Sequence, residues 1–186
     1  VRSRGLGDVY KRQVMLIGLI LLLISSVVLF AGGQKELSEA QHKAGSEARD
    51  WAAEVSNALK GRYGDMHEKI VKDGNRNSPE YQEFQKTLAM YVDKFKVTYI
   101  YTLIKVSDEM TNLIVDAADE EYADEYGAEY EMEDQMVSAF GGTPDYAKDI
   151  WKDDDFGWQI SAFAPLYNSQ GKIVAIIGID RPVSSK

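Results

Sequence analysis

The feature that most constrains this chain is a run of twenty residues without a charged side chain, residues 14–33, VMLIGLILLLISSVVLFAGG. At about 1.5 Å per residue, a helix of this length matches the roughly 30 Å hydrocarbon core of a bilayer. A signal peptide has a shorter apolar core of about 7–15 residues and a small-residue cleavage site. Leu29-Phe30-Ala31 is a poor site of that kind. The run therefore predicts a retained transmembrane helix, with a cleaved signal peptide as the alternative.

The residues before this run predict its orientation. They carry four basic side chains and one acidic one: Arg2, Arg4, Lys11, Arg12 and Asp8. Basic loops stay on the cytoplasmic side, so we expect a cytoplasmic leader at residues 1–13 and an extracytoplasmic domain at residues 34–186 of a single-pass cell-membrane protein. The leader RSRGLGDVYKRQ also resembles an adaptor-derived sequence that is found fused to unrelated reading frames. If it is one, the leader carries no information on orientation, but the apolar run still stands.

Beyond the leader the chain is strongly acidic. Without the leader's four bases and one acid, the chain's 21 Lys and Arg become 17 and its 30 Asp and Glu become 29, a net charge of −12. Because phosphate binding needs the opposite sign, nucleic acid is not an expected partner. The chain has no cysteine, which excludes disulfides and thiolate metal sites.

The acidity is concentrated between Lys105 and Lys148, where no basic residue occurs. This gap contains residues 119–134, DEEYADEYGAEYEMED, in which tyrosines alternate with acidic clusters. One interpretation is a solvated surface segment. The other is a lid that responds to cations, because carboxylates supply the hard oxygen ligands that Ca²⁺ prefers. The spacing does not match an EF-hand loop, so no metal site is predicted.

Two helices are predicted in the first half of the domain. Apolar and alanine residues recur at three- and four-residue intervals over residues 35–60, which predicts a long helix ending at Gly61. Its alanine-rich stripe allows another element to approach closely. A second helix begins at Pro79, which suits the first helical position, and Ser78 can cap it. Its predicted buried face consists of Tyr81, Phe84, Leu88, Val92 and Phe95.

After the second helix, apolar residues recur at every second position instead of every third or fourth. Residues 97–106 and 111–117 are rich in β-branched and aromatic side chains and predict two strands. Residues 131–140 predict a short helix, and two further strands flank the turn at residues 168–171. Helices followed by antiparallel strands predict an α+β domain, with the helices packed on one face of the sheet.

No catalytic constellation is recognisable in the sequence. His42 and His67 are the only histidines, and both fall in the helical part, where each is interpreted as a lone surface side chain. No glycine-rich phosphate loop follows a strand, and the carboxylate run at residues 153–155 is interpreted as a loop. We therefore expect no enzymatic activity, no catalytic residue and no cofactor.

The C-terminal part of the chain resembles a known family. Residues 158–180 read W-x-x-S-x-x-A-P-h-Y…G-K-h-h-A-h-h-G-h-D, where h is apolar, and they follow the strand segments YIYT and IVDA. Over residues 35–185 the chain resembles the Cache (PAS-like, extracytoplasmic) sensor domain. The resemblance implies a PAS-like antiparallel sheet, a long N-terminal helix rising from the membrane, and a small-molecule pocket between the sheet and the segment before the last hairpin.

The resemblance also implies a function. Such domains are the sensing inputs of membrane receptors, in which a second membrane helix leads to a chemotaxis signalling, histidine kinase or diguanylate cyclase module. We therefore expect a truncated receptor whose output half is missing here, with the membrane and a small molecule as partners and a homodimer formed through the N-terminal helix. The alternative is a membrane-anchored interaction module without a metabolite, whose acidic segment meets a partner protein or cations.

Five ligand-binding residues are implied by the resemblance: Tyr101, Asp116, Trp158, Ser161 and Asp180. Family members that bind amino acids hold the ligand amine with a carboxylate and the ligand carboxylate with an arginine. Here no arginine lies between Arg76 and Arg181, so a cationic, amine-bearing or neutral ligand fits better. In the alternative interpretation Tyr101 and Trp158 belong to the core and Asp180 caps a strand.

Overall fold

The computed structural model describes residues 36–119 and 121–185, so the predicted leader and transmembrane helix lie outside the described residues. Within the described residues, no helix is long and apolar enough to cross a membrane. The elements follow in the order α2 Glu39–Leu59, α3 Arg62–Asp73, α4 Pro79–Phe95, β1 Tyr99–Lys105, β2 Met110–Asp116, β3 Glu129–Glu131, α5 Asp134–Phe140, β4 Asp145–Tyr146, β5 Trp151–Asp153, β6 Gly157–Tyr167 and β7 Ile173–Pro182.

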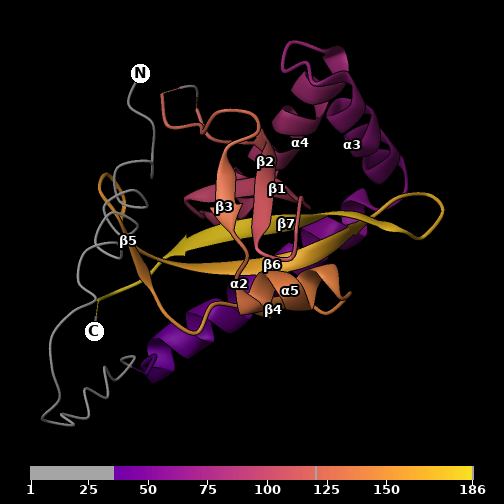
Figure 1. The fold of residues 1–186 in the computed structure, drawn as a ribbon. Helices are drawn as coiled ribbons and strands as arrows, with labels where there is room; N and C mark the ends of the chain where they lie inside the picture. The colour runs from indigo at the N-terminus through magenta and orange to yellow at the C-terminus, as the bar shows by residue number, and fades with distance from the viewer. Residues whose placement is uncertain (1–35, 120, 186) are drawn as a thin grey trace, which may run out of the picture.

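The strands form one curled antiparallel sheet (Figure 1). Their order is β3-β2-β1-β7-β6-β4, and β5 also pairs with β6. The longest pairing is the β6–β7 hairpin, whose turn contains Gly171 at a φ of 75°. The strands predicted at residues 97–106 and 111–117, and the final hairpin, are confirmed. The structure is thus α+β, as the change of period predicts.

Helix α2 lies within the predicted residues 35–60, but it begins at Glu39, after a cap at Ser38 that the sequence analysis did not identify. Ser38 accepts a hydrogen bond from the backbone of Gln41, whose side chain accepts from the backbone of Ser38, and this capping box satisfies two free N–H groups. The alanine stripe is buried, with Ala48 and Ala52 fully covered in the main core cluster. Because alanine is small, the helix lies close against β6 and β7.

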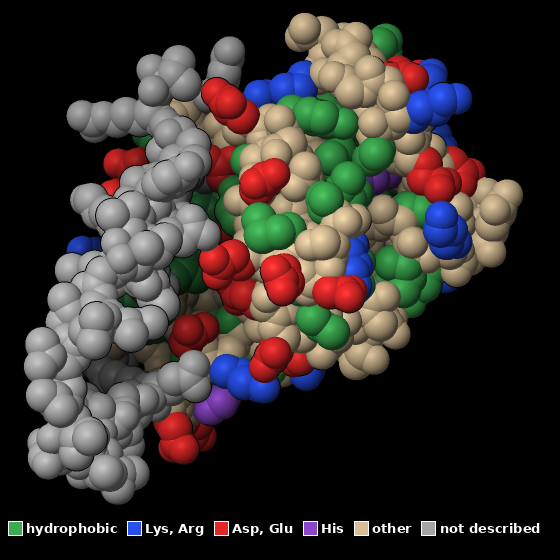
Figure 2. Space-filling model, viewed as in Figure 1, with side chains coloured by type: hydrophobic (Ala, Val, Ile, Leu, Met, Phe, Trp, Pro, Cys, Tyr) green, Lys and Arg blue, Asp and Glu red, His purple; other side chains and the backbone are tan. Residues whose placement is uncertain are grey.

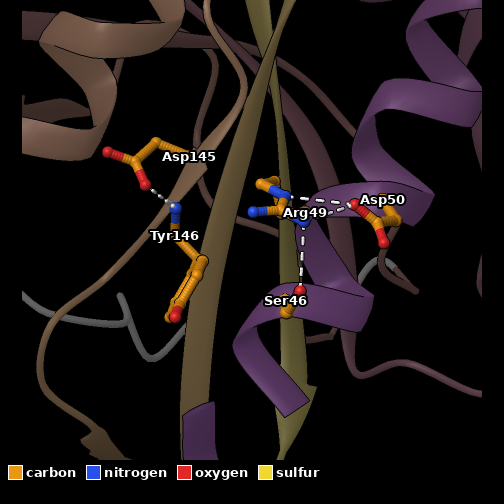
Figure 3. A network of polar contacts seen from close by, with 5 residues as sticks. All are labelled: Ser46, Arg49, Asp50, Asp145 and Tyr146. Carbon is orange, nitrogen blue, oxygen red and sulfur yellow. Dashed lines mark hydrogen bonds and ion pairs between the residues drawn. The ribbon is translucent and has the colours of Figure 1, made fainter. Parts of the chain in front are cut away.

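The same helix has a polar outer face (Figure 3) and also a tight contact with β4. Arg49 donates hydrogen bonds to Ser46 and Asp50 on the solvent side. At Gly45 a Cβ would lie 2.2 Å from the ring of Tyr146, so a glycine is needed where β4 crosses the helix. The helix therefore touches both the centre and the edge of the sheet.

The two faces of the sheet are covered by different elements, which corrects the prediction that helices pack on one face only. In Figure 1, α2 runs behind the sheet and α5 in front of it. Side chains alternate between the faces along a strand, so Ala162 and Ala164 of β6 join the cluster with α2, whereas Phe163 joins the cluster with α5. The segment before α5 lies on this second face.

Some elements differ from the prediction. The short helix expected from residue 131 begins only at Asp134, after strand β3. Strands β3, β4 and β5 were not predicted, because two or three residues are too few to display a period of two. The prediction of a surface His67 is wrong, since this side chain is fully buried on α3.

Candidate functional site

Four of the five predicted site residues come together on the α5 face of the sheet. Strand pairing sets Tyr101 of β1 opposite Asp116 of β2. It also sets Asp180 of β7 between Tyr99 of β1 and Ser161 of β6. We call the group of Tyr101, Asp116, Ser161 and Asp180 the Asp180 site. Its members come from four adjacent strands, so the pairing register alone brings them together.

Asp180 is the centre of this site. Its side chain is 4% exposed, and its carboxylate accepts hydrogen bonds from the Tyr101 hydroxyl at 3.2 Å and from Ser161. Burial raises the pKa of Asp180 to about 7, although these two hydrogen bonds lower it, and the nearby charge of Asp116 raises it further. Asp180 is therefore a buried carboxyl group that changes charge near neutral pH.

Gly178 gives Tyr101 the room to reach Asp180. A Cβ at Gly178 would lie 2.4 Å from the Tyr101 ring and 3.0 Å from the ring of Phe163. Gly178 is paired directly opposite Tyr101 in the β1–β7 register. The Tyr101 ring can thus lie across β7 and place its hydroxyl near Asp180, two residues further along the strand.

Asp116 connects the sheet to the acidic segment. It is buried, and its carboxylate accepts hydrogen bonds from the backbone N–H groups of Ala118 at 2.9 Å and Asp124 at 3.0 Å. Further along the segment, the Tyr130 hydroxyl donates to the carboxylate of Asp124, and burial together with this carboxylate raises the Tyr130 pKa. The Asp116 carboxylate thus holds the backbone of the acidic segment against the Asp180 site, and the bond between Tyr130 and Asp124 fixes the segment internally.

The acidic surface around the site has few basic neighbours. Figure 2 shows acidic side chains spread over the front face, with most Lys and Arg at its margins. Within residues 36–119 and 121–185, no group of three or more acidic or histidine side chains is placed to hold a metal ion. What the site offers is therefore a set of carboxylate and hydroxyl oxygens, with aromatic rings beside them.

Trp158 is the predicted residue that the structure does not bring to the site. It shares a strand face with Ile160, which packs on the α2 side of the sheet, and Ser161 points to the opposite face. A different tryptophan contacts the site: the Trp151 indole N–H of β5 donates to Ser161 Oγ at 2.9 Å. Sequence reasoning missed Trp151 because β5 has only three residues.

The β5–β6 hairpin closes one side of the site through aromatic contacts. The Tyr99 hydroxyl donates to Asp153 at 3.0 Å, and the ring of Phe156 meets that of Tyr99 edge-on at 5.6 Å. Phe156 also contacts Tyr122 of the acidic segment at 5.1 Å between ring centroids. The hairpin and the acidic segment therefore touch each other beside the carboxylates. Trp151 stays partly exposed at this edge.

Two hollows lie at the other end of the sheet. One of about 510 Å³ lies between β1, β7 and α5 and includes Ile104, Phe140 and Ile173. The other, of about 320 Å³, lies beside α3 and includes Val71 and Lys172. Neither contains a residue of the Asp180 site, whose carboxylates are covered by side chains.

No family model and no curated protein matches the chain. Among solved structures, the ligand-binding domain of Campylobacter jejuni chemoreceptor Tlp3 in complex with 4-methylisoleucine matches at 11% identity and a TM-score of 0.36, over 78% of this chain and 61% of that one. The sensory domain of the same chemoreceptor with isoleucine bound matches at 13% identity and a TM-score of 0.37, over 76% and 58%. The extracellular domain of a histidine kinase, mmHK1S-Z2, matches at 12% identity and a TM-score of 0.37, over 76% of this chain and 58% of that one.

This chain thus spans about three fifths of the length of those structures. The first two are parts of a chemoreceptor, and the third is the extracellular part of a histidine kinase.

Proposed function

We propose that this chain contains the extracytoplasmic small-molecule-sensing domain of a membrane receptor, with a PAS-like fold. The observation that carries the proposal is the Asp180 carboxyl group, which is buried beside a second acidic side chain, Asp116. Among the described residues, no lysine or arginine forms an ion pair with Asp180. A buried charge without a cation is costly, and a bound cation would offset that cost.

The surroundings of Asp180 favour an amine-bearing or cationic ligand. A ligand ammonium could donate a charge-assisted hydrogen bond to the Asp180 carboxylate. Aromatic faces attract cations, and Tyr101 and Trp151 both contact this group of residues. The chain has no arginine between Arg76 and Arg181 that could hold a ligand carboxylate. Tyr101, Asp116, Ser161 and Asp180 are the proposed ligand-binding residues, with Trp151 in the place of Trp158.

The same proposal includes the membrane arrangement. The uncharged run at residues 14–33 anchors the chain, the basic leader stays in the cytoplasm, and the domain from residue 34 onward lies outside. A homodimer forms through the alanine-rich N-terminal helix. The output is a chemotaxis, histidine kinase or diguanylate cyclase module that follows in the full receptor.

A thermal-shift screen of metabolites tests the ligand class. The full chain in lipid nanodiscs is heated with amines, amino acids, carboxylic acids and neutral sugars. A ligand at about 100 times its dissociation constant should add roughly 2.7 kcal/mol to the free energy of unfolding. We expect shifts with amines, and we expect Asp180→Asn to abolish them.

The matched control is Asp93→Asn, which changes an exposed carboxylate on α4 and should leave the shift intact. Equal shifts in Asp180→Asn and the wild type would show that Asp180 does not bind the ligand. Shifts only with carboxylic acids would contradict the proposed ligand class. No shift with any metabolite would favour the interaction module.

A further inference from the structure

His67 is not a member of the Asp180 site, yet its surroundings are unusual for a histidine. The side chain is fully buried on α3, where its ring meets that of Phe84 at 5.7 Å. Burial lowers the pKa of His67 to about 3, so the imidazole stays neutral at physiological pH. Its Nε2 atom lies 2.9 Å from the hydroxyl oxygen of Thr102 on β1. His67 is thus a fixed hydrogen-bonding group between α3 and the sheet.

Thr102 stands where the pairing of β1 and β2 becomes irregular. Tyr101 pairs with Asp116, but Leu103 pairs with Leu113, so β2 uses one residue more than β1 over this interval. Such an irregularity leaves a backbone group without its ladder partner. Here the Thr102 hydroxyl oxygen accepts the N–H of Val115 at 3.0 Å. The threonine side chain therefore takes over a bond that regular pairing would have supplied.

The hydrogen bonds of this pair leave one atom unmatched. A neutral imidazole has one N–H donor and one acceptor nitrogen, and Nε2 is used by Thr102. His67 Nδ1 is buried without a hydrogen-bond partner. In either tautomer the interior thus contains an unpaired polar atom, which costs free energy. An apolar side chain would avoid this cost, so the bond to Thr102 calls for a role beyond stability.

We propose that His67 is a positioning residue for the Asp180 site, acting through Thr102 to hold the irregular pairing that sets Tyr101 beside Asp180. Tyr101 and Thr102 are neighbours on opposite faces of β1. A shift of the backbone at Thr102 therefore moves the Tyr101 hydroxyl, which lies 3.2 Å from the Asp180 carboxylate. Helix α3 is in this way connected to a site on the far face of the sheet. The inference rests on the proposed function for its biological meaning, but its geometry does not require a ligand.

The test follows the titration of Asp180 by carboxyl carbon NMR in the full chain, with no ligand present. The hydrogen bond from Tyr101 lowers the Asp180 pKa, which stands at about 7. Tyr101→Phe removes that bond directly, so the rise that it causes in the Asp180 midpoint is the reference for the other variants. We expect Thr102→Val and His67→Phe to shift the midpoint in the same direction. The titrations of Asp116 and Glu133, whose charges act on Asp180, are followed in the same spectra.

A double variant separates positioning from other effects. Adding Thr102→Val to Tyr101→Phe should shift the Asp180 midpoint no further than Tyr101→Phe alone, because both changes remove the same bond. Thr102→Ser keeps the hydroxyl and should retain the wild-type midpoint. If Thr102→Val does not fold, His67→Asn replaces it, since the shorter amide cannot reach Thr102. The same upward shift of the Asp180 midpoint is then expected.

Ser56→Ala is the matched control for loss of a buried hydrogen bond. Ser56 is buried on α2 and donates to the carbonyl of Pro165 on β6. The variant should lower stability without changing the Asp180 titration. If Thr102→Val and His67→Phe behave like Ser56→Ala, or if their shift adds fully to that of Tyr101→Phe, the inference is overturned. A failed metabolite screen would leave this result unaffected, so the two failures can be told apart.

Discussion

At the scale of single residues, Asp180 is the member of the site whose pKa is raised into the neutral range. Its pKa in the folded chain is about 7, against an ordinary value of 3.8. Between these two values the folded state binds a proton that the unfolded state has lost. The free energy of unfolding therefore falls as the pH rises from about 4 to about 7, and the full penalty of the buried charge is present above pH 7.

This sign predicts how Asp180→Asn changes stability. The neutral amide removes the penalty, so the variant should gain stability relative to the wild type at pH 8, by at most about 4 kcal/mol, and gain little at pH 4.5. Urea unfolding of both proteins at the two pH values measures the difference. Asp93→Asn, on the exposed surface, should show no such change with pH. A difference between wild type and Asp180→Asn that is the same at both pH values would contradict the raised pKa.

Gly178 allows a second prediction at this scale. A methyl group there would overlap the Tyr101 ring, at 2.4 Å. Gly178→Ala should therefore cost about 1–3 kcal/mol of unfolding free energy and raise the midpoint of the Asp180 titration by moving Tyr101 away. In a Tyr101→Ala background the ring is absent, so the cost of Gly178→Ala should fall sharply. An equal cost in both backgrounds would show that the ring is not what Gly178 accommodates.

At the scale of elements, Arg181 joins strand β7 to helix α2. It follows Asp180 directly and points to the opposite face, where it donates to the carbonyl of Ala44 at 3.2 Å and pairs with Glu47. Its guanidinium also lies 4.6 Å from the centre of the Trp51 ring. Adjacent residues of β7 thus contact the Asp180 site and the N-terminal helix. A displacement of the strand therefore changes the contacts of both.

Arg181→Lys tests how much of this junction depends on the planar guanidinium. Lysine keeps the charge but cannot stack on Trp51 while it holds two acceptors, so we expect a loss of about 1 kcal/mol in urea unfolding. Arg49→Lys is the control, because the hydrogen bonds that Arg49 makes among the described residues go to Ser46 and Asp50 of its own helix. Equal, negligible losses for both variants would mean that the junction does not stabilise the fold.

At the scale of the whole molecule, the described residues share cores on both faces of one sheet. The main cluster joins α2, α3 and α4 to β1, β2, β6 and β7, and a second cluster joins α5 to the same sheet. Because helices and strands from both halves of the domain contribute to these clusters, residues 36–185 should fold without the membrane segment. A single cooperative thermal transition, followed by circular dichroism, is the expected result. A gradual loss of signal with no transition would show that α2 needs a partner helix.

Local signals in the sequence were enough to predict α2, α4, β1, β2 and the final hairpin. The cap at Ser78, an apolar period of three to four or of two, and a glycine in the last turn all act within a few residues of one another. The family resemblance pointed to Asp180 and Tyr101, which the strand register then brought together. For that reason the position of most site residues could be anticipated.

Only the tertiary structure decided the rest, because it depends on contacts between distant segments. Trp151 rather than Trp158 contacts Ser161, since the three-residue strand β5 folds back on β6 and alternation points Trp158 to the other face. His67 is buried because α3 packs on α4 and β7, and no residue near His67 in the sequence indicates this packing. The raised pKa of Asp180 likewise arises from strands that meet only in the folded sheet. Periodicity is a local property of the chain, but burial, register and electrostatic environment belong to the assembled fold.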